Sequence, residues 1–506
     1  MYTFSSKLKT FSFILMLIGV LGIGYGFLTA PKDIQEVEKI LAAESHGTHH
    51  AEAATYEVEA AHEPVATEHK TSVEHEAVAV SATDSASGKE IDSVHTDTIA
   101  VTAAGVEPSV ANHDNQETTA HKKEAVDHED AHAEHEAHLK HVLHQLQNKP
   151  WAALYVACIF FMLVSMGVLA FYAIQQVAQA GWSPVLFRVM QGITAYLPVA
   201  SIIFFIILLL TGLHVFESNH LFIWMDKDVV AHDELIQAKS GYLNFPFWII
   251  RAAVFLLGWN AYRYFSRKNC LAQDESNDDS FYKKNFNISA MFLVFFIVSE
   301  SIMSWDWIMS IDPHWFSTLF GWYVFASFFV SGITTIALVT VYLKSKGYLE
   351  YVNTSHIHDL AKFMFGISVF WTYLWFSQFM LIWYANIPEE VTYFVTRIEL
   401  YNLPFFGAVV MNFLFPILIL INTDFKRITW VIVMAGIVIL AGHYIDFFNM
   451  IMPGTVGDQW FIGVAEIGSV LFFLGLFIFV VFTALGKSPL LPKRNPFIEE
   501  SKHFHY

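Results

Sequence analysis

Cysteine is almost absent from this 506-residue chain, which has two, Cys158 and Cys270. Cys158 lies in an apolar run and Cys270 in a charged loop, so we expect no disulfide between them. The chain has no CxxCH sequence, which excludes covalently attached c-type haem, and two thiolates cannot hold an iron–sulfur cluster by themselves. If the chain takes part in redox chemistry, the metal centres therefore lie mostly on other chains.

Basic residues are also few, with 29 Lys and Arg against 47 Asp and Glu, although 55% of the chain is hydrophobic. Residues 31–150 account for most of this imbalance, because they carry 24 acidic residues and 8 Lys; they also carry 15 of the 24 His. A chain this acidic repels phosphate, which excludes nucleic-acid binding. The net charge of −18 thus belongs mainly to one insert, and the rest of the chain is nearly neutral.

Ten apolar runs are long enough to cross a membrane, since about 20 apolar residues span roughly 30 Å of hydrocarbon. They are residues 11–30, 151–175, 195–216, 245–265, 288–308, 319–343, 362–386, 403–422, 428–450 and 461–485. Continuous helix satisfies the backbone polar groups in lipid. The sequence therefore predicts an all-α integral membrane protein with about ten transmembrane helices.

The first run has two interpretations, a retained helix or a secretory signal peptide. Lys7 and Lys9 give it the basic start of a signal peptide. Its apolar stretch is long, however, and Leu28-Thr29-Ala30 is a poor cleavage site, so a retained helix is favoured.

Loop charges alternate along the chain. Basic residues such as Lys268 and Lys344 follow the fourth and sixth runs, whereas acidic residues such as Asp226 and Glu389 follow the third and seventh. Basic loops stay in the cytoplasm. The pattern predicts cytoplasmic N- and C-termini and places the insert 31–150 on the outer side.

Short sequence motifs recur in the same order in the two halves of the apolar region. The pairs are Asn244–Pro246 with Asn402–Pro404, Asp306–Pro313 with Asp446–Pro453, and Tyr196–Leu197 with Tyr373–Leu374. We interpret them as a four-helix unit over 151–316 that is repeated over 317–458. Because the unit has an even number of helices, the two copies run parallel. Residues 1–30 supply a first flanking helix, and residues 459–506 a tenth helix and a tail.

Ionisable residues within the spans crowd into the outer half, and such residues are costly in lipid and often functional. Candidates for a proton path or a quinol site are His214, Glu217, Arg251, Glu300, Asp306, His443, Asp446 and Glu466. Carboxylates beside histidines can accept and relay protons, and quinol oxidation releases two protons with two electrons.

Structural roles are the alternative for most of these residues. Glu217, Asp306 and Asp446 lie near the interface, where they could be solvated or cap helices, and Arg251 could pair with any neighbouring acid. His443 could be a satisfied core histidine. His214 and His443 are the histidines of the ten runs, and both lie at the outer end, so the stacked haem pair of a cytochrome b is excluded.

The insert is poor in aromatic residues and rich in Ala, Glu and His, a composition that predicts disorder over most of its length. Histidines near its end recur every three or four residues, which would place His128, His132, His135 and His138 on one helix face. Such a stripe could hold Zn or Cu. A solvated helix or linker is the favoured alternative.

The segment SWDWIMSIDPHWFSTLFG at 304–321 resembles the NrfD/polysulfide-reductase-type membrane subunits of bacterial alternative complex III, a quinol:cytochrome c oxidoreductase. The resemblance extends over all ten runs and is greatest to the ActF type. It implies a place in the bacterial inner membrane, with the insert in the periplasm, and a complex that oxidises menaquinol on the outer side. The His-rich insert departs from the family pattern.

The resemblance also implies partners. They are an NrfD-like sister subunit that holds the better-supported quinol site, an iron–sulfur subunit, multihaem and monohaem cytochrome c subunits, and a terminal oxidase. Haem c and the iron–sulfur clusters lie on these partners, and the NrfD-like subunits bind no metal.

Three functional hypotheses remain open at this stage. The chain is a subunit that contributes to quinol oxidation, a structural and proton-conducting subunit without its own quinol site, or, less favoured, a secondary transporter. A transporter usually has broken helices around a midplane site. Here the spans are mostly uninterrupted, apart from Pro198 and Pro416.

Overall fold

The computed structural model describes residues 2–42 and 116–505, with side chains from residue 134 onward in the second range. Within these residues, every regular element is a helix, and nine helices are long and apolar enough to cross a membrane. The described chain is thus an all-α, multi-pass membrane protein, and nine of the ten predicted spans are confirmed. The remaining run, 245–265, lies in a helix of 29 residues whose polar residues, Arg251 and Asn260 among them, lower its apolarity.

The helices follow one another in chain order. They are α1 (Ser6–Thr29), α3 (Gln116–Val177), η1 (Pro184–Leu186), α4 (Phe187–Ile193), α5 (Tyr196–Gly212), η2 (Ile223–Met225), α6 (Lys227–His232), α7 (Glu234–Ala238), α8 (Phe245–Gln273), α9 (Ser280–Trp307), η3 (Met309–Ile311), α10 (Phe320–Ser345), α11 (Thr354–Ala385), α12 (Pro388–Glu399), α13 (Asn402–Val409), η4 (Val410–Leu414), α14 (Phe415–Leu420), η5 (Phe425–Arg427), α15 (Thr429–Val456), α16 (Val464–Leu485) and α17 (Ile498–Lys502).

The chain consists of two compact units. The first is a helical body formed by residues 1–34 together with 140–506, and the second is formed by residues 35–139. The helical body begins at residue 140, ten residues before the expected boundary at 150, and α3 continues through Pro150. Asn148 donates hydrogen bonds to the carbonyls of His220 (3.2 Å) and Thr455 (3.0 Å). In the second unit, residues 35–42 belong to a short helix that begins at residue 34, and residues 116–139 are helical. The predicted disorder falls mainly on residues 43–115, outside the described residues.

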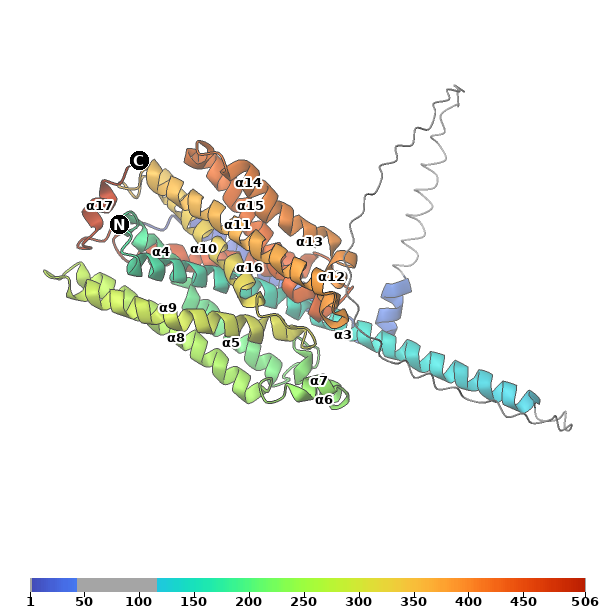
Figure 1. Cartoon of the computed structure of the whole chain (residues 1–506). Coiled ribbons are helices and arrows are strands. Elements are labelled where there is room, and N and C mark those ends of the chain that lie inside the picture. Colours follow the sequence, from blue (N-terminus) through green and yellow to red (C-terminus); the bar gives the residue numbers. More distant parts are fainter. Residues whose placement is uncertain (1, 43–115, 506) are drawn as a thin grey trace, which may run out of the picture. The chain divides into compact units, whose positions relative to one another are not determined.

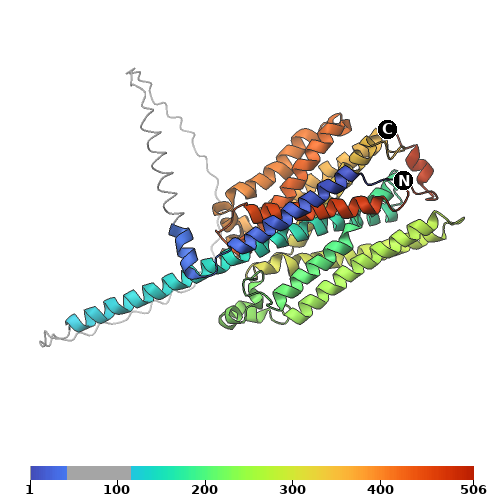
Figure 2. The ribbon, with the colours of Figure 1, turned by 180° about the vertical axis from the view of Figure 1, so that it is seen from behind.

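The two ends of the chain lie at the same end of the helical body (Figure 1). The Thr3 amide approaches the Tyr348 hydroxyl at 3.5 Å, and the Asn353 side chain donates a hydrogen bond of 2.6 Å to the Phe504 carbonyl. Helices α6, α7 and α12 lie at the opposite end (Figures 1 and 2). An even number of membrane crossings would place both termini on the same side of the membrane.

Helices α3 and α10 contain the two most buried spans of the body. They approach closely at Gly167 and Gly332, where a Cβ added to Gly332 would lie 2.7 Å from the Val168 backbone nitrogen. Without water to drive association, membrane helices pack closely through small residues. Helices α8 and α9 lie along one edge of the body, and α13 and α14 along the opposite edge (Figures 1 and 2).

The first helix, α1, packs along α16, and Figure 2 shows the two side by side. The buried residues of α1 are Ser12, Leu15, Gly19, Gly22 and Gly26, a spacing of three and four that defines one face. A Cβ at Gly22 would lie 2.9 Å from the Gly468 Cα. The retention of α1 as a helix of the protein stays a prediction.

The residues of the repeated motifs lie in different environments in the two halves. Asn244 caps α8 by accepting a 3.1 Å hydrogen bond from the Phe247 amide, whereas Asn402 is the first residue of α13. Tyr196 is fully buried, but Tyr373 is 64% exposed. The duplication of a four-helix unit therefore stays a prediction.

Candidate functional site

A buried polar cluster lies between α10, α11 and α15, and we call it the Asp446 cluster. Its members are Tyr323, Ser327, Trp371, His443 and Asp446. Helix α15 places His443 and Asp446 one turn apart on the same face, as their spacing predicted, with 3.8 Å between His443 Nδ1 and Asp446 Oδ2. Both side chains are almost completely buried.

Three donors converge on the Asp446 carboxyl group. Tyr323 Oη donates to Oδ1, while Ser327 Oγ and Trp371 Nε1 donate to Oδ2 at 2.7 and 2.9 Å. Tyr323 and Ser327 are four residues apart on α10, so they reach the carboxyl group from adjacent turns of one helix. These donors fix the position of the carboxyl group within the bundle.

Ser327 also connects the carboxyl group to the imidazole, because its Oγ lies 2.9 Å from His443 Nδ1. A serine has one O–H, so when that hydrogen points to Asp446 the oxygen accepts from the Nδ1–H of His443. This assigns the neutral imidazole proton to Nδ1 and leaves Nε2 as an acceptor. Within the described residues, Nε2 has no hydrogen-bond partner.

Asp446 has no Lys or Arg within ion-pair distance in the part of the chain that the structure describes. Burying a carboxylate without a countercharge is costly. The Asp446–His443 pair has two arrangements without net charge, a carboxylic acid beside a neutral imidazole and a carboxylate beside an imidazolium. They differ in the position of one proton, and Ser327 lies between the two sites.

A cavity of about 10 Å³ adjoins Tyr323, and its lining includes Gln378, Tyr393, Arg397 and Asn449. This volume is close to what one water molecule occupies. Gln378 Oε1 and Asn449 Oδ1 are buried without a partner among the described residues, so both are available to bind such a water.

Arg397 belongs to α12 and lines this cavity. Its guanidinium lies over the Tyr393 ring at 3.3 Å, and its Nε donates a 3.0 Å hydrogen bond to the Asn449 carbonyl. Arg397 is buried and forms no ion pair within the described residues. Sequence reasoning missed it, because α12 lies between the predicted spans; the amphipathic pattern of this short helix is the signal that could have indicated it.

Asn412 is a further buried polar group near the cluster. It lies in η4, a π-helical segment that interrupts the eighth span. Both polar atoms of its side chain lack a partner among the described residues, and the side chain packs against Gly442, the residue before His443. Isolated π-helical turns are often found at functional sites.

Arg251 and Asp306 form a separate ion pair between α8 and α9. The pair is bidentate, with Nε–Oδ2 and Nη2–Oδ1 distances of 2.6 and 2.9 Å, and the Asp306 side chain is fully buried. Arg251 also lies over the rings of Tyr242 and Phe247 at 4.1 and 4.2 Å. The structural alternative for Arg251, pairing with a neighbouring acid, is what the structure shows.

The other candidates join neither the Asp446 cluster nor this pair. Glu300 is buried in α9, where Oε1 accepts a 2.8 Å hydrogen bond from Ser301 and Oε2 has no partner among the described residues. Glu466 accepts a 2.9 Å hydrogen bond from the Gly463 amide and so caps α16. His214 and Glu217 are exposed in the loop after α5, so His214, although within the predicted span 195–216, lies outside the helix that the structure shows.

The four candidate insert histidines, His128, His132, His135 and His138, lie on α3, as the three- and four-residue spacing predicted. The side chains of His128 and His132 lie outside the described residues. Among described side chains, which include His135 and His138, no group of three or more His, Cys, Asp and Glu residues is placed to hold a metal ion.

Comparison of the sequence with protein-family models and with curated proteins gives no match.

Proposed function

We propose that this chain is a membrane subunit of a quinol:cytochrome c oxidoreductase of the alternative complex III type, and that it transfers protons through the Asp446 cluster. The observation that supports the proton-transfer role is the buried Asp446–Ser327–His443 connection without a Lys or Arg at ion-pair distance from Asp446 in the described residues. A proton can change its position along this connection without creating net charge in a low-dielectric interior. The redox centres, haem c and iron–sulfur clusters, lie on partner subunits in this proposal.

The size of the adjoining cavity favours a proton-conducting subunit over one that binds quinol at this cluster. A volume of about 10 Å³ holds one water molecule, whereas pockets that bind small organic ligands have volumes of about 300–1,000 Å³. In this proposal menaquinol binds to the sister subunit, and protons reach the Asp446 cluster through water. The cavity beside Arg397 then connects the cluster to the end of the body where α12 lies.

The assembled complex, purified from native membrane, tests the proposal. Haem c and iron–sulfur chains should co-purify with this chain, and its isolation as a lone chain would contradict membership in the complex. In that complex, Asp446→Asn and Ser327→Ala should slow proton release coupled to quinol oxidation, by roughly 10²-fold for the loss of a general acid–base group.

Ser331→Ala is the matched control. Ser331 lies one turn from Ser327 on α10 and is equally buried, but it donates its hydrogen bond to the Ser327 backbone carbonyl, at 2.8 Å. This control should keep the native rate. If folded, assembled Asp446→Asn retains both native turnover and native proton yield, the Asp446 cluster has no part in proton transfer.

A further inference from the structure

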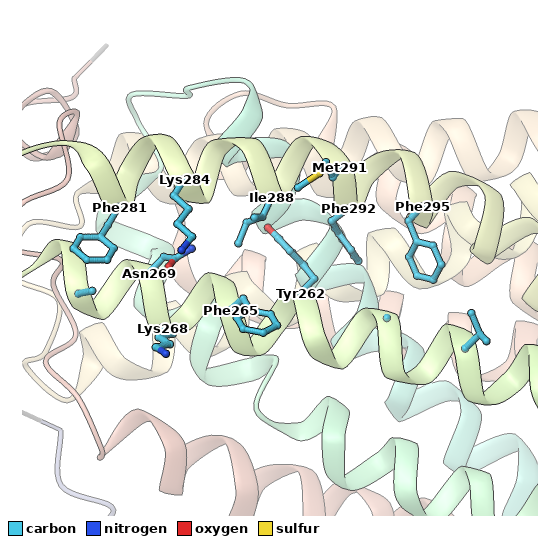
Figure 3. A pocket seen from close by; sticks show the side chains of 13 residues that line it. Tyr262, Phe265, Lys268, Asn269, Phe281, Lys284, Ile288, Met291, Phe292 and Phe295 are labelled. Carbon is cyan, nitrogen blue, oxygen red and sulfur yellow. The ribbon is translucent and has the colours of Figure 1, made fainter.

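A long groove lies between α8 and α9 (Figure 3), and its lining includes no residue of the Asp446 cluster. The two helices lie at the edge of the helical body (Figure 1). Its volume is about 680 Å³, within the usual range for ligand pockets. The groove extends from Val254 to Ala272 along α8, and Phe281 to Phe295 of α9 form the other wall. Its centre is formed by Tyr262, which stacks on Phe292 with 3.9 Å between ring centroids.

The walls of the groove are apolar over most of its length. Gly258 of α8 lies in the lining, and a Cβ there would lie 2.5 Å from the Phe295 ring. The absence of a side chain at Gly258 therefore lets Phe295 of α9 pack against α8. Exposed apolar side chains border the opening, with Val254 at 51%, Phe265 at 53% and Met291 at 64% exposure. In a membrane-spanning helix pair, such an opening faces hydrocarbon chains.

Two lysines line the groove about one helical turn from its end at Ala272 and Phe281, and Figure 3 shows Lys268 and Lys284 near Asn269 there. Lys268 comes from α8 and Lys284 from α9, so the two helices each contribute one cation. Both side chains are exposed, and neither forms an ion pair within the described part of the chain.

None of the four acidic residues of the intervening loop, Asp274, Glu275, Asp278 and Asp279, forms an ion pair with either lysine in the described part of the chain. Asp274 pairs with Arg188 at 2.6 Å and accepts the Lys493 amide at 2.9 Å. Asp278 accepts hydrogen bonds from the hydroxyl groups of Ser276 (2.6 Å) and Ser280 (2.8 Å). Lys268 and Lys284 are therefore not paired with a carboxylate within the described residues.

We propose that this groove binds an anionic phospholipid. The phosphate of the headgroup lies between Lys268 and Lys284, and one acyl chain follows the apolar walls towards Val254. Fourteen residues separate Lys268 from Val254, which is about 21 Å along a helix, a length that suits an acyl chain extending from the interface to beyond the bilayer centre. Basic pockets between membrane helices bind anionic headgroups in this way.

Native mass spectrometry of the purified full-length chain, exchanged into nanodiscs of phosphatidylglycerol or phosphatidylcholine, tests this site. The native chain should retain one phosphatidylglycerol after release into detergent and no equivalent phosphatidylcholine. Lys268→Gln with Lys284→Gln should weaken this retention about 30-fold, roughly fivefold for each lysine. Lys283→Gln is the matched control, because Lys283 is exposed on α9 but does not line the groove.

Met291→Trp narrows the apolar part of the groove without changing its charge, and it should also reduce retention. Equal retention of phosphatidylglycerol and phosphatidylcholine, or native retention by the double lysine variant, would overturn the proposal. A quinone that displaces the lipid whatever its headgroup would assign the groove to an isoprenoid tail instead. None of these outcomes depends on the Asp446 cluster, so they leave the proton-transfer proposal unaffected.

Discussion

Replacing Asp306 with Asn should strongly destabilise the helical body. The substitution removes the countercharge of Arg251, whose Nε and Nη2 lie 2.6 and 2.9 Å from the carboxylate oxygens. The Arg251 side chain is 10% exposed, so its charge would remain largely in the protein interior. Removing one partner of a buried pair costs about 3–5 kcal/mol in the free energy of unfolding. We expect the lower end, about 3 kcal/mol, because the Tyr242 carbonyl and the rings of Tyr242 and Phe247 still contact the guanidinium.

The double variant Arg251→Met with Asp306→Asn separates the charge effect from simple loss of packing. Removing both charges is often neutral for a buried pair, so most of the lost stability should return. Unfolding of the purified protein by sodium dodecyl sulfate, followed by far-ultraviolet circular dichroism, measures each free energy. Glu217→Gln is the control for loss of a carboxylate, since Glu217 is exposed, and it should change stability by less than about 0.5 kcal/mol. A single Asp306 variant as stable as the native protein, or a double variant no more stable than the single one, would refute the structural role of the pair.

Three further perturbations test the packing and the loop that contains α7. Gly332→Ala should cost about 1–3 kcal/mol in the same unfolding assay, because its Cβ would meet the α3 backbone at 2.7 Å. Gly22→Leu should release α1 from α16 and expose α1 to added protease, whereas Gly24→Leu, whose Cβ would have no neighbour within 4 Å, should not. The Ile236 amide, which donates to the carboxylate, holds the pKa of Asp233 below its usual range, so this cap stabilises α7 above the usual Asp pKa and is lost as pH falls through the lowered value. Hydrogen-exchange protection of the α7 amides should fall in that acidic range, and Asp233→Asn, which keeps a capping oxygen, should abolish the dependence on pH.

The positions of the spans could be predicted from the sequence because each is a local property of about 20 residues. The same holds for His443 and Asp446, since a spacing of three on a helix fixes a shared face whatever packs against it. The 245–265 run lies in a helix as predicted, although its polar residues make it less apolar than the other spans.

Partners across helices could not be predicted, because they depend on which faces of distant segments meet. Trp371 is 75 residues from Asp446 and Tyr323 is 123 residues from it, yet both bind its carboxyl group. The sequence showed Tyr323 and Ser327 as ordinary members of an apolar run, and no local pattern distinguishes a hydroxyl that binds a neighbouring helix from one that binds its own. Ser331, one turn away, is a residue of the second kind.

Asp306 and Asp446 show most clearly how far spacing alone can support a functional inference. Each precedes a proline by seven residues, so the two are equivalent candidates in the sequence. Both are also buried in the structure. Their chemistry differs because α8 supplies Arg251 beside Asp306, whereas α10 and α11 supply neutral donors to Asp446. A carboxylate fixed by a bidentate guanidinium can give up its negative charge only by leaving that cation unpaired, which opposes proton uptake. A carboxyl group that binds Tyr323, Ser327 and Trp371 has no such constraint and contacts an imidazole through one hydroxyl group. Of two acids that the sequence could not distinguish, Asp446 is therefore the one suited to exchange a proton, and Asp306 the one suited to hold two helices together.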